Sequence, residues 1–573
     1  MAQLAGKLDL EERVSYIAST TPHDAEKDGY ADAKTPGELE DGALVEGGAL
    51  HLFSREAFGL FSQYGAIGII YGMIPYLSYA LYTNYLGMEG YQTASYGVLV
   101  TTGWSFKVFW GMLSDCFPIF GYRRKSWMLI GWTITMICLA IMTFSPFGAP
   151  YCDRRLANDL CDLPIEKVKP ADVAKYFDLE APNRGTLFIL LSMFVSFGYV
   201  IAACASDAMV VEYAQREPIA IRGRVQTAIY TVRTLTGILS QLVIAFFLNG
   251  KEYGGTFTFS VGPNVIFGIC LIPCVFVVLT TIFVVVEKKT PRTPLGEWLS
   301  MFWNLLQQRV MWQICAFRFI SNCFSGIGAT PGSPIQSVWA KVEPLNDSLS
   351  GVLGSLIFAG ILAAVGKWGL NWNWRYTIAA GAIGIILIDG FVLFITIWDV
   401  FRNQWFFTGV ALADNVPAGV RFIISTYCAV EIADVGNEGA TYGLVTTISN
   451  LAGPFASVIY KYIDSFFKVS LNDIKKDTTE IRWEVTYCYL ISFGCKIAAL
   501  GWLWMLPPQK AQMQELKKRG GKSKLAGAIL IVVFFGALSF AMTSNIMAIL
   551  PSTKCYRIAG GKGTVNGSCI VKK

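Results

Sequence analysis

Apolar runs long enough to cross a bilayer recur along this chain, and polar segments separate them. A helix needs roughly 20 predominantly apolar residues to span the hydrocarbon core, so these runs predict membrane-spanning helices. The composition agrees, because 53% of the 573 residues are hydrophobic and only 15% are charged. Soluble domains are about 45–50% apolar and about 25% charged. The chain is therefore predicted to be an all-α polytopic membrane protein.

Twelve of the runs fall into two groups of six. The first group is expected at 62–83, 91–112, 126–146, 186–210, 225–248 and 263–286. The second group is expected at 310–331, 349–366, 377–398, 404–430, 439–462 and 484–506. Six spans, a linker and six further spans are typical of a transporter built from two halves. The sequence therefore predicts two six-helix bundles.

The segments outside the spans define the expected domain boundaries. Residues 1–50 contain eleven Asp or Glu against four Lys or Arg and no long apolar run, which predicts a disordered acidic cytoplasmic tail. The N-terminal bundle is expected at 51–286 and the C-terminal bundle at 310–506. A cytoplasmic linker at 287–309 would join them.

The last segment, 507–573, starts with a basic stretch and continues with an uncharged apolar run at 525–550. That run is long enough to span, so it predicts a thirteenth helix. Cys555 and Cys569 beyond it could then pair in an oxidising compartment. The alternative is a re-entrant or peripheral helix.

Lysine and arginine gather in short segments between the apolar runs, such as the elbow at 121–125. By the positive-inside rule these segments face the cytoplasm. The net charge of +6 therefore indicates membrane topology, with lipid as a partner, and no nucleic acid is expected to bind. The expected location is a multi-pass position in the plasma membrane.

Catalytic and metal-binding motifs are missing from the sequence. Both histidines, His23 and His51, precede the first span, and no HExxH, nucleophile-elbow or paired CxxC motif occurs. We therefore expect no metal, no cofactor and no enzymatic activity. Cys152 and Cys161 flank a short acidic stretch in an expected outer loop, and a disulfide is expected between them.

Ionisable residues occur inside the predicted spans of both halves. Each costs about 2.5–3.5 kcal/mol on insertion scales, and such residues normally face a water-filled cavity. As a set they predict a polar cavity between the bundles. The alternative for any one of them is a structural pair between helices. The residues are Lys107, Asp207, Arg233, Arg318, Asp389, Asp414, Arg421 and Lys496.

Spacing places some of these charges on shared helix faces. Tyr230 and Arg233 lie on one face of the expected helix 225–248, because residues three or four apart are neighbours on a helix. Asp414 and Arg421 share a face of the expected helix 404–430, and Pro417 between them should loosen its hydrogen-bond ladder.

A second group of charges flanks the expected cytoplasmic ends and suggests a salt-bridge latch that closes one gate. Asp207 could belong either to this latch or to the cavity. The expected gate or coupling residues are Asp115, Arg123, Arg124, Asp207, Glu212 and Arg222.

Two blocks resemble the folate–biopterin transporter family of the major facilitator superfamily. The first, at 107–127, reads KVFWGMLSDCFPIFGYRRKSW, and the second, at 207–218, reads DAMVVEYAQREP and is followed by Arg233. Val108 departs from the pattern, since many relatives place proline there. The resemblance implies the major facilitator fold and uptake of folates or unconjugated pterins, coupled to protons. Some protozoan relatives carry S-adenosylmethionine instead, and that alternative stays open.

A folate carries a pterin ring and a tail with two carboxylates, and each part needs its own chemistry. Carboxylates favour arginine or lysine, so Lys107, Arg233 and Arg318 are expected to hold the tail, with Arg421 in the same cavity. A carboxylate accepts the paired N–H groups of a pterin edge. The residues expected to read that edge or to carry the coupled proton are Asp389 or Asp414, and those expected to stack on the ring are Trp104 and Tyr230.

Overall fold

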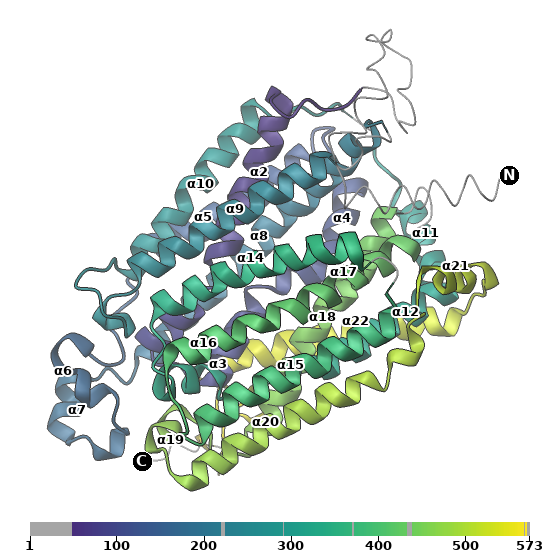
Figure 1. Ribbon diagram of the computed structural model, residues 1–573. Helices are drawn as coiled ribbons and strands as arrows, with labels where there is room; N and C mark the ends of the chain where they lie inside the picture. Colours follow the sequence, from purple (N-terminus) through teal and green to yellow (C-terminus); the bar gives the residue numbers. More distant parts are fainter. Residues whose placement is uncertain are drawn as a thin grey trace.

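The computed structural model describes residues 48–218, 224–289, 291–369, 372–432, 438–565 and 568–569. The expected tail at 1–50 therefore lies almost entirely outside the described residues, and so does Arg222. Long helices run roughly side by side through the molecule (Figure 1). The described part has the predicted all-α character, with one short hairpin of β1 (Thr564–Val565) and β2 (Ser568–Cys569) near the C-terminus.

The N-terminal half is built around the long helix α8 (Ala181–Gln215), which packs against α5 (Lys125–Phe144). Its other main elements are α2 (Arg55–Met73), η1 (Ser78–Tyr85), α3 (Gly90–Leu99), η2 (Thr102–Phe106), α4 (Lys107–Cys116), α9 (Arg224–Phe247) and α10 (Pro263–Phe283). Helices α2 and α9 touch closely, since a Cβ atom on Gly72 would lie 2.6 Å from the Cα atom of Gly237. Small residues allow such close packing between membrane helices.

In the C-terminal half, α12 (Arg309–Ser325) packs against α18 (Glu438–Asp464) and α20 (Thr479–Leu500). The other elements of this half are α13 (Gly332–Pro334), η6 (Ile335–Trp339), α14 (Pro344–Trp368), α15 (Trp374–Ile397), α16 (Gln404–Ala411), η7 (Leu412–Asp414), α17 (Asn415–Ile432) and η8 (Leu503–Met505). The halves meet where α14 contacts α9 and where α18 contacts α3, η2 and α4.

Two predicted spans are interrupted in the structure. The span expected at 91–112 breaks between α3 and α4, where the hydroxyls of Thr101 and Thr102 each donate at 2.8 Å to a carbonyl one turn earlier. Such bonds compete with the helical ladder. The span expected at 404–430 breaks at η7, shortly before Pro417, as a proline in the ladder requires.

Nine helices of the described part are long and apolar enough to cross a membrane. One is α22 (Lys524–Ile549), the expected thirteenth helix, which lies against α3 of one half and α18 of the other. The first candidate span starts at Arg55, and the expected linker at 287–309 contains a helix, α11 (Leu295–Gln307).

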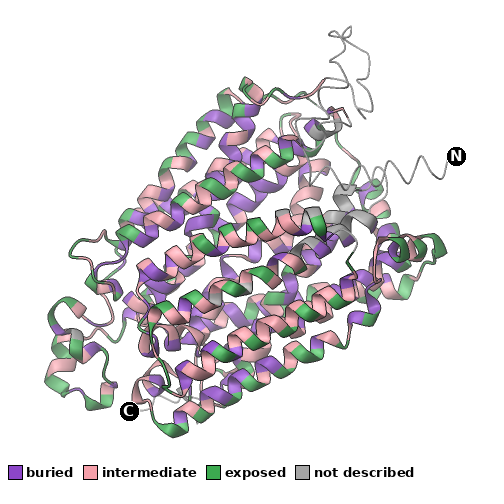
Figure 2. Ribbon diagram, viewed as in Figure 1, coloured by how far each residue is buried: buried purple, intermediate pink, exposed green. Residues whose placement is uncertain are grey.

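Figure 2 shows exposed residues along the outer faces of the long helices. On α10 these are apolar, and they include Ile272, which is 69% exposed, and Phe283, which is 66% exposed. Apolar side chains on the outside are stable where lipid replaces water.

The two ends of the helical body differ in chemistry. We call one the basic end, formed by residues 121–125, α11 and α21 (Lys510–Arg519). The other is the disulfide end (Figure 1). It is formed by η3 (Ile165–Lys167), α6 (Arg154–Cys161), α7 (Pro170–Tyr176), η5 (Lys251–Tyr253), α19 (Leu471–Lys476), η9 (Arg557–Ala559) and the chain around them.

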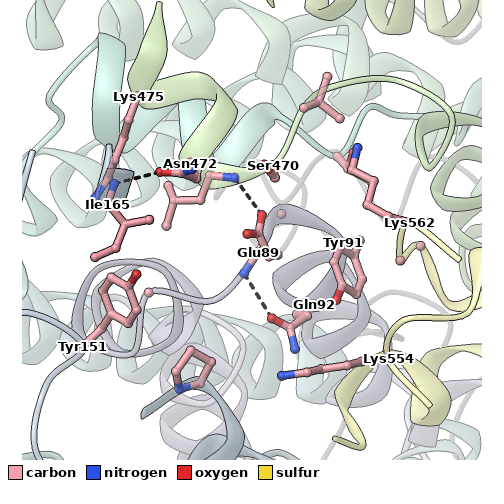
Figure 3. Close-up of a pocket in the computed structure, with 18 of the residues that line it drawn as sticks. Glu89, Tyr91, Gln92, Tyr151, Ile165, Ser470, Asn472, Lys475, Lys554 and Lys562 are labelled. Carbon is pink, nitrogen blue, oxygen red and sulfur yellow. Dashed lines mark hydrogen bonds between the residues drawn. The ribbon is translucent and has the colours of Figure 1, made fainter. Parts of the chain in front are cut away.

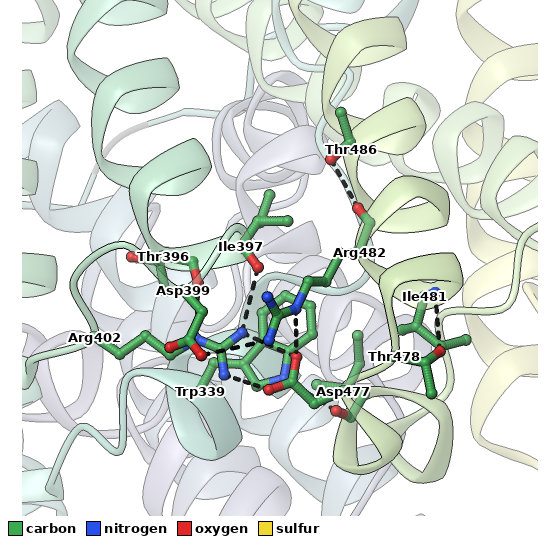
Figure 4. A network of polar contacts seen from close by, with 11 residues as sticks. Trp339, Thr396, Ile397, Asp399, Arg402, Asp477, Thr478, Ile481, Arg482 and Thr486 are labelled. Carbon is green, nitrogen blue, oxygen red and sulfur yellow. Dashed lines mark hydrogen bonds and ion pairs between the residues drawn. The ribbon is translucent and has the colours of Figure 1, made fainter.

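An ionic network fastens the C-terminal half at the disulfide end (Figure 4). Arg402 and Arg482 both bind Asp477, at 2.5 and 2.9 Å, and both also reach Asp399. Burial raises the pKa of Asp477, but hydrogen bonds from the two arginines outweigh it and hold that pKa below its usual value of 3.8. The network ties the loop after α15 to the start of α20.

Candidate functional site: a charged and aromatic cluster in the N-terminal half

The predicted charges of the N-terminal half converge on one cluster. The break before α4 places Lys107 at the first position of that helix, facing Asp207 on α8. The ammonium Nζ lies 2.6 Å from Asp207 Oδ2, and the hydroxyl of Tyr64 on α2 donates to the other carboxylate oxygen. The Lys107 and Asp207 side chains are 19% and 25% exposed, so the pair is accessible. Asp207 thus lies with the expected cavity residues.

Arg233 on α9 completes the cluster from the opposite side. Its guanidinium carbon lies 4.9 Å from the ring centre of Tyr71 and 5.3 Å from that of Trp104. These are cation–π distances. Within the described part of the chain Arg233 forms no salt bridge. Its guanidinium is therefore a permanent cation held in position by aromatic rings.

The predicted stacking residues take part in the same cluster. Trp104 Nε1 donates to the hydroxyl of Tyr199 at 3.3 Å, which fixes the indole plane. The Tyr230 ring is 39% exposed and packs edge-on against Tyr64, with centroids 6.2 Å apart. Three contributing aromatics, Tyr64, Tyr71 and Tyr199, were not singled out from the sequence, because aromatic residues are common throughout these spans.

The C-terminal half contributes two arginines of the predicted set. Arg318 on α12 is 6% exposed and donates to Ser449 on α18 at 3.1 Å. Arg421 on α17 is exposed and donates to Ser325 at 3.2 Å. Both bind neutral hydroxyls through the contacts described.

One predicted carboxylate of this half, Asp389, does not join the cluster. Asp389 on α15 instead lies 3.4 Å from Lys496 on α20, which matches the alternative of a structural pair. The side chain of Asp414 lies outside the described residues.

Four of the predicted gate residues, Asp115, Arg123, Arg124 and Glu212, lie together at the basic end. Arg124 Nη1 lies 2.7 Å from Asp115, and Nη2 lies 3.4 Å from Glu212. The backbone N–H groups of Arg123, Arg124 and Lys125 all donate to the carboxylate of Glu287, at 2.7–2.9 Å. An acidic group at a helix N-terminus is favourable. The role of Glu287 was missed from the sequence, although it directly follows the sixth apolar run.

The halves are fastened together at the disulfide end. Lys461 on α18 is fully buried and donates at 2.7 Å both to Ser95 on α3 and to Asn545 on α22. At Gly90 a Cβ atom would lie 1.9 Å from the carbonyl oxygen of Thr330, so only glycine allows this contact between the halves. Sequence reasoning missed Lys461, since a lysine near a helix end usually extends to the interface.

Access to the cluster is indicated at the boundary between the halves. Asn450 on α18 is exposed, yet its side chain donates at 3.4 Å to the carbonyl of Trp104 across the boundary. The backbone N–H of Val108 donates to Thr447 at 3.3 Å nearby. An exposed side chain of the C-terminal half therefore lies beside the cluster at this boundary.

The outer-loop cysteines predicted to pair, Cys152 and Cys161, form a disulfide with their Cα atoms 5.7 Å apart. Cys555, at the same end, is disulfide-bonded as well. Within the described residues no group of His, Cys, Asp or Glu side chains has the arrangement of a metal site.

Comparisons with known proteins agree with this architecture. The model of the BT1 family matches residues 68–150, which include Lys107 and the basic elbow. The chain is 22% identical to Folate transporter 1 of Plasmodium falciparum over 430 residues, or 72% of each protein. It is 21% identical to the Folate-biopterin transporter of Synechocystis sp. over 387 residues, or 64% of this chain and 66% of that protein.

Solved structures show the same fold at low sequence identity. A D-xylose-proton symporter superimposes with a TM-score of 0.52 and 14% identity, over 79% of this chain and 98% of that one. A peptide transporter, POT, in complex with sulfate gives a TM-score of 0.51 and 13% identity, over 82% and 97%.

The fold and these matches define the class. The chain is an integral multi-pass membrane protein with the major facilitator fold, and the family model and relatives that it matches are those of transporters. The predicted resemblance to the folate–biopterin transporter family is confirmed by the BT1 match and by both relatives.

Proposed function

We propose that this protein is a secondary active transporter of folates or unconjugated pterins, located in the plasma membrane. The observation that carries the proposal is that positively and negatively charged side chains lie together in one aromatic cluster. Arg233 offers a cation without a salt-bridge partner among the described residues, and the ammonium of the Lys107–Asp207 pair lies 5.7 Å from the same Trp104 ring. The two relatives named for folate and biopterin transport support the same substrate class.

The roles follow from the chemistry of each group. Arg233 would hold a substrate carboxylate, because a guanidinium matches carboxylate geometry in two parallel hydrogen bonds. Trp104 and Tyr230 would lie against the pterin ring. Arg318 and Arg421 would meet the substrate from the C-terminal half when the halves close around it.

Transport would proceed by alternating access. The disulfide end is the fastened end here, through Lys461 and the Gly90 contact, so this state supports a form that releases substrate at the basic end. The basic end would face the cytoplasm by the positive-inside rule. The bonds of Arg124 to Asp115 and Glu212 lie within the N-terminal half, so they leave the basic end open here, and they would change partners when the halves close at that end.

Coupling to protons is part of the proposal. Asp207 binds both an ammonium and a phenol, and a carboxylate in such a site can exchange a proton when its partner moves. Asp389, paired with Lys496, is the second candidate. Uptake would then rise as the external pH falls, and a protonophore would abolish the accumulation.

The test is competitive uptake in a host that lacks its own folate and pterin carriers. Cells expressing the full chain are given labelled folate, biopterin or S-adenosylmethionine, each with the other two unlabelled in excess. We expect folate and biopterin to be accumulated and to compete with each other. Accumulation of S-adenosylmethionine alone, unaffected by both, would replace the proposed substrate class with the alternative that the sequence left open.

A further inference from the structure

A pocket of about 410 Å³ lies at the disulfide end, apart from the charged cluster at Lys107. Its walls come from three parts of the chain that are distant in sequence. Glu89 and Tyr91 belong to the N-terminal half, Asn472 and Lys475 to α19 of the C-terminal half, and Lys554 and Lys562 to the segment after α22 (Figure 3). The pocket therefore exists only while these parts are together.

Direct hydrogen bonds hold the pocket walls in place. The Glu89 carboxylate accepts the backbone N–H of Leu471 at 2.7 Å, and the Asn472 side chain accepts the N–H of Ile165 at 3.0 Å. Gly560 packs against the Tyr91 ring with φ at +101°, a conformation that glycine adopts without strain. The two hydrogen bonds join the two halves, and the Gly560 contact adds the C-terminal segment to the wall of the same pocket.

Positive charge dominates the lining. Three lysines face two carboxylates, those of Glu89 and Asp464, and Asp464 is buried with its Oδ2 bonded to the Thr330 N–H at 2.7 Å. Within the described residues Lys475 and Lys554 form no salt bridge. Their ammonium groups donate to the neutral oxygens of Cys161 and Asn183.

Electrostatics around the lysines favour an added anion. Burial, with a smaller contribution from Arg154, lowers the pKa of Lys475 to about 8, although Asp162 and Glu89 act in the opposite direction. Burial also lowers the pKa of Lys554. A cation that is costly to keep charged is stabilised when an anion binds beside it.

Aromatic groups complete the lining. Tyr91, Tyr151 and Phe177 contribute rings, and the last two meet edge-on with centroids 5.8 Å apart. Ligand pockets usually enclose about 300–1,000 Å³, so this one suits a small molecule near the lower end of that range. Rings beside ammonium groups match a ligand that is both flat and anionic.

We propose that this pocket is a second binding site, separate from the transport site, for a small aromatic carboxylate that reaches it from the disulfide side. Because the pocket is shared by the two halves, the bound ligand favours the state in which that end is closed. A ligand shifts a conformational equilibrium by its difference in affinity between the states. Binding of the ligand at this site from outside therefore slows the transport cycle, and we call this effect the external brake.

The binding test uses the purified full chain in nanodiscs and benzene-1,3-dicarboxylate as the probe. The K475Q/K554Q variant should bind the probe at least roughly tenfold more weakly, the loss expected for one charge-assisted hydrogen bond. Lys251→Gln is the matched control, since Lys251 is an exposed lysine at the same end outside the pocket. Equal affinity in the double variant would overturn the proposal.

A second measurement uses only the wild-type protein and so does not depend on the folding of a variant. Lysines are acetylated with and without the probe and quantified by mass spectrometry. We expect the dicarboxylate to protect Lys475 and Lys554, but not Lys251. Equal labelling with and without the probe would contradict the site. Protection by inorganic phosphate as strong as by the probe would contradict the aromatic preference.

A third measurement tests the brake and rests on the proposed function, because it follows uptake of labelled folate. External dicarboxylate should lower the maximal uptake rate, and excess folate should not restore it. Restoration by excess folate would mean that the probe occupies the transport site and would overturn the brake. The first two measurements need no transport, so failure of the folate proposal leaves them decisive.

Discussion

Removing the charges of Lys107 and Asp207 together should be less harmful than the sum of the two single removals. Their atoms are 2.6 Å apart, and about four fifths of each side chain is shielded from solvent. Two unit charges 4 Å apart attract by about 4 kcal/mol at an effective dielectric constant of 20, and the cost of desolvation offsets part of that. We therefore expect a net coupling of about 2 kcal/mol, near the value for a hydrogen bond between charged groups.

The assay is a double-mutant cycle with Lys107→Met and Asp207→Asn on the full chain in mild detergent. The free energy of unfolding is measured for the wild type, both single variants and the double variant. Asp207→Asn alone should cost about 3 kcal/mol, because it leaves a largely buried ammonium without its counter-ion. The double variant should be more stable than the sum of the single effects predicts, by about 2 kcal/mol.

The exposed pair Arg519–Glu515, at 2.6 Å, is the matched control. The two side chains are 66% and 58% exposed, so the coupling in this pair should stay below about 1 kcal/mol. Additive effects at Lys107 and Asp207, within about 0.5 kcal/mol, would refute the reasoning that burial makes this pair strong.

Three further outcomes follow from the structure. Arg233→Ala should lower the apparent folate affinity by roughly tenfold or more, because a charge-assisted bond to the substrate is lost. Thr234→Ala on the same helix is the control and should leave the affinity unchanged. Equal uptake kinetics in the two variants would contradict the assignment of Arg233. The pKa of Asp477 is depressed in the folded state, so this carboxylate contributes fully to stability when the pH is above the usual pKa of 3.8, and the contribution is lost as the pH falls through the lower pKa of the folded state. Asp477→Asn should therefore make the unfolding temperature fall less steeply below about pH 4. An unchanged pH profile would contradict this. Dicarboxylate affinity at the second site should fall between pH 7 and 9, since Lys475, with a pKa of about 8, loses its charge there; a constant affinity would contradict this.

The long helices were predictable because the bilayer imposes one length and one polarity on each span. Pro417 also indicated the break in the span expected at 404–430, but the break in the span expected at 91–112 was not predictable. The interruption before α4 depends on the hydroxyls of Thr101 and Thr102 bonding to their own backbone. Threonine hydroxyls make such bonds in continuous helices too, so the sequence alone does not reveal that the ladder gives way at this point.

The charged residues of the candidate site were predictable from the sequence, but their partners were not. A charge inside a span signals function or pairing, and Lys107, Asp207 and Arg233 were found on that ground. Their partners depend on which helix faces meet, and that is decided by packing between distant segments. Asp389 shows the limit, since Lys496 lies 107 residues away along the chain and 3.4 Å away in space.

The pocket at the disulfide end could not be predicted from the sequence. Its three lysines lie in two short stretches outside the spans, where basic residues are ordinary. Only the approach of α19 and the C-terminal segment to Glu89 brings them together. Lys461 was overlooked in a similar way, because its two acceptors come from α3 and α22.

The central claim is that this chain alone binds a folate or a pterin at the Lys107, Asp207 and Arg233 cluster and moves it across a membrane. The most direct measurement is uptake of labelled folate into liposomes that contain only the purified protein, with and without an inward proton gradient. The account predicts saturable uptake that the gradient accelerates and that Arg233→Ala abolishes or greatly reduces. Liposomes that take up neither folate nor biopterin under either condition, with correctly folded protein in the bilayer, would contradict it.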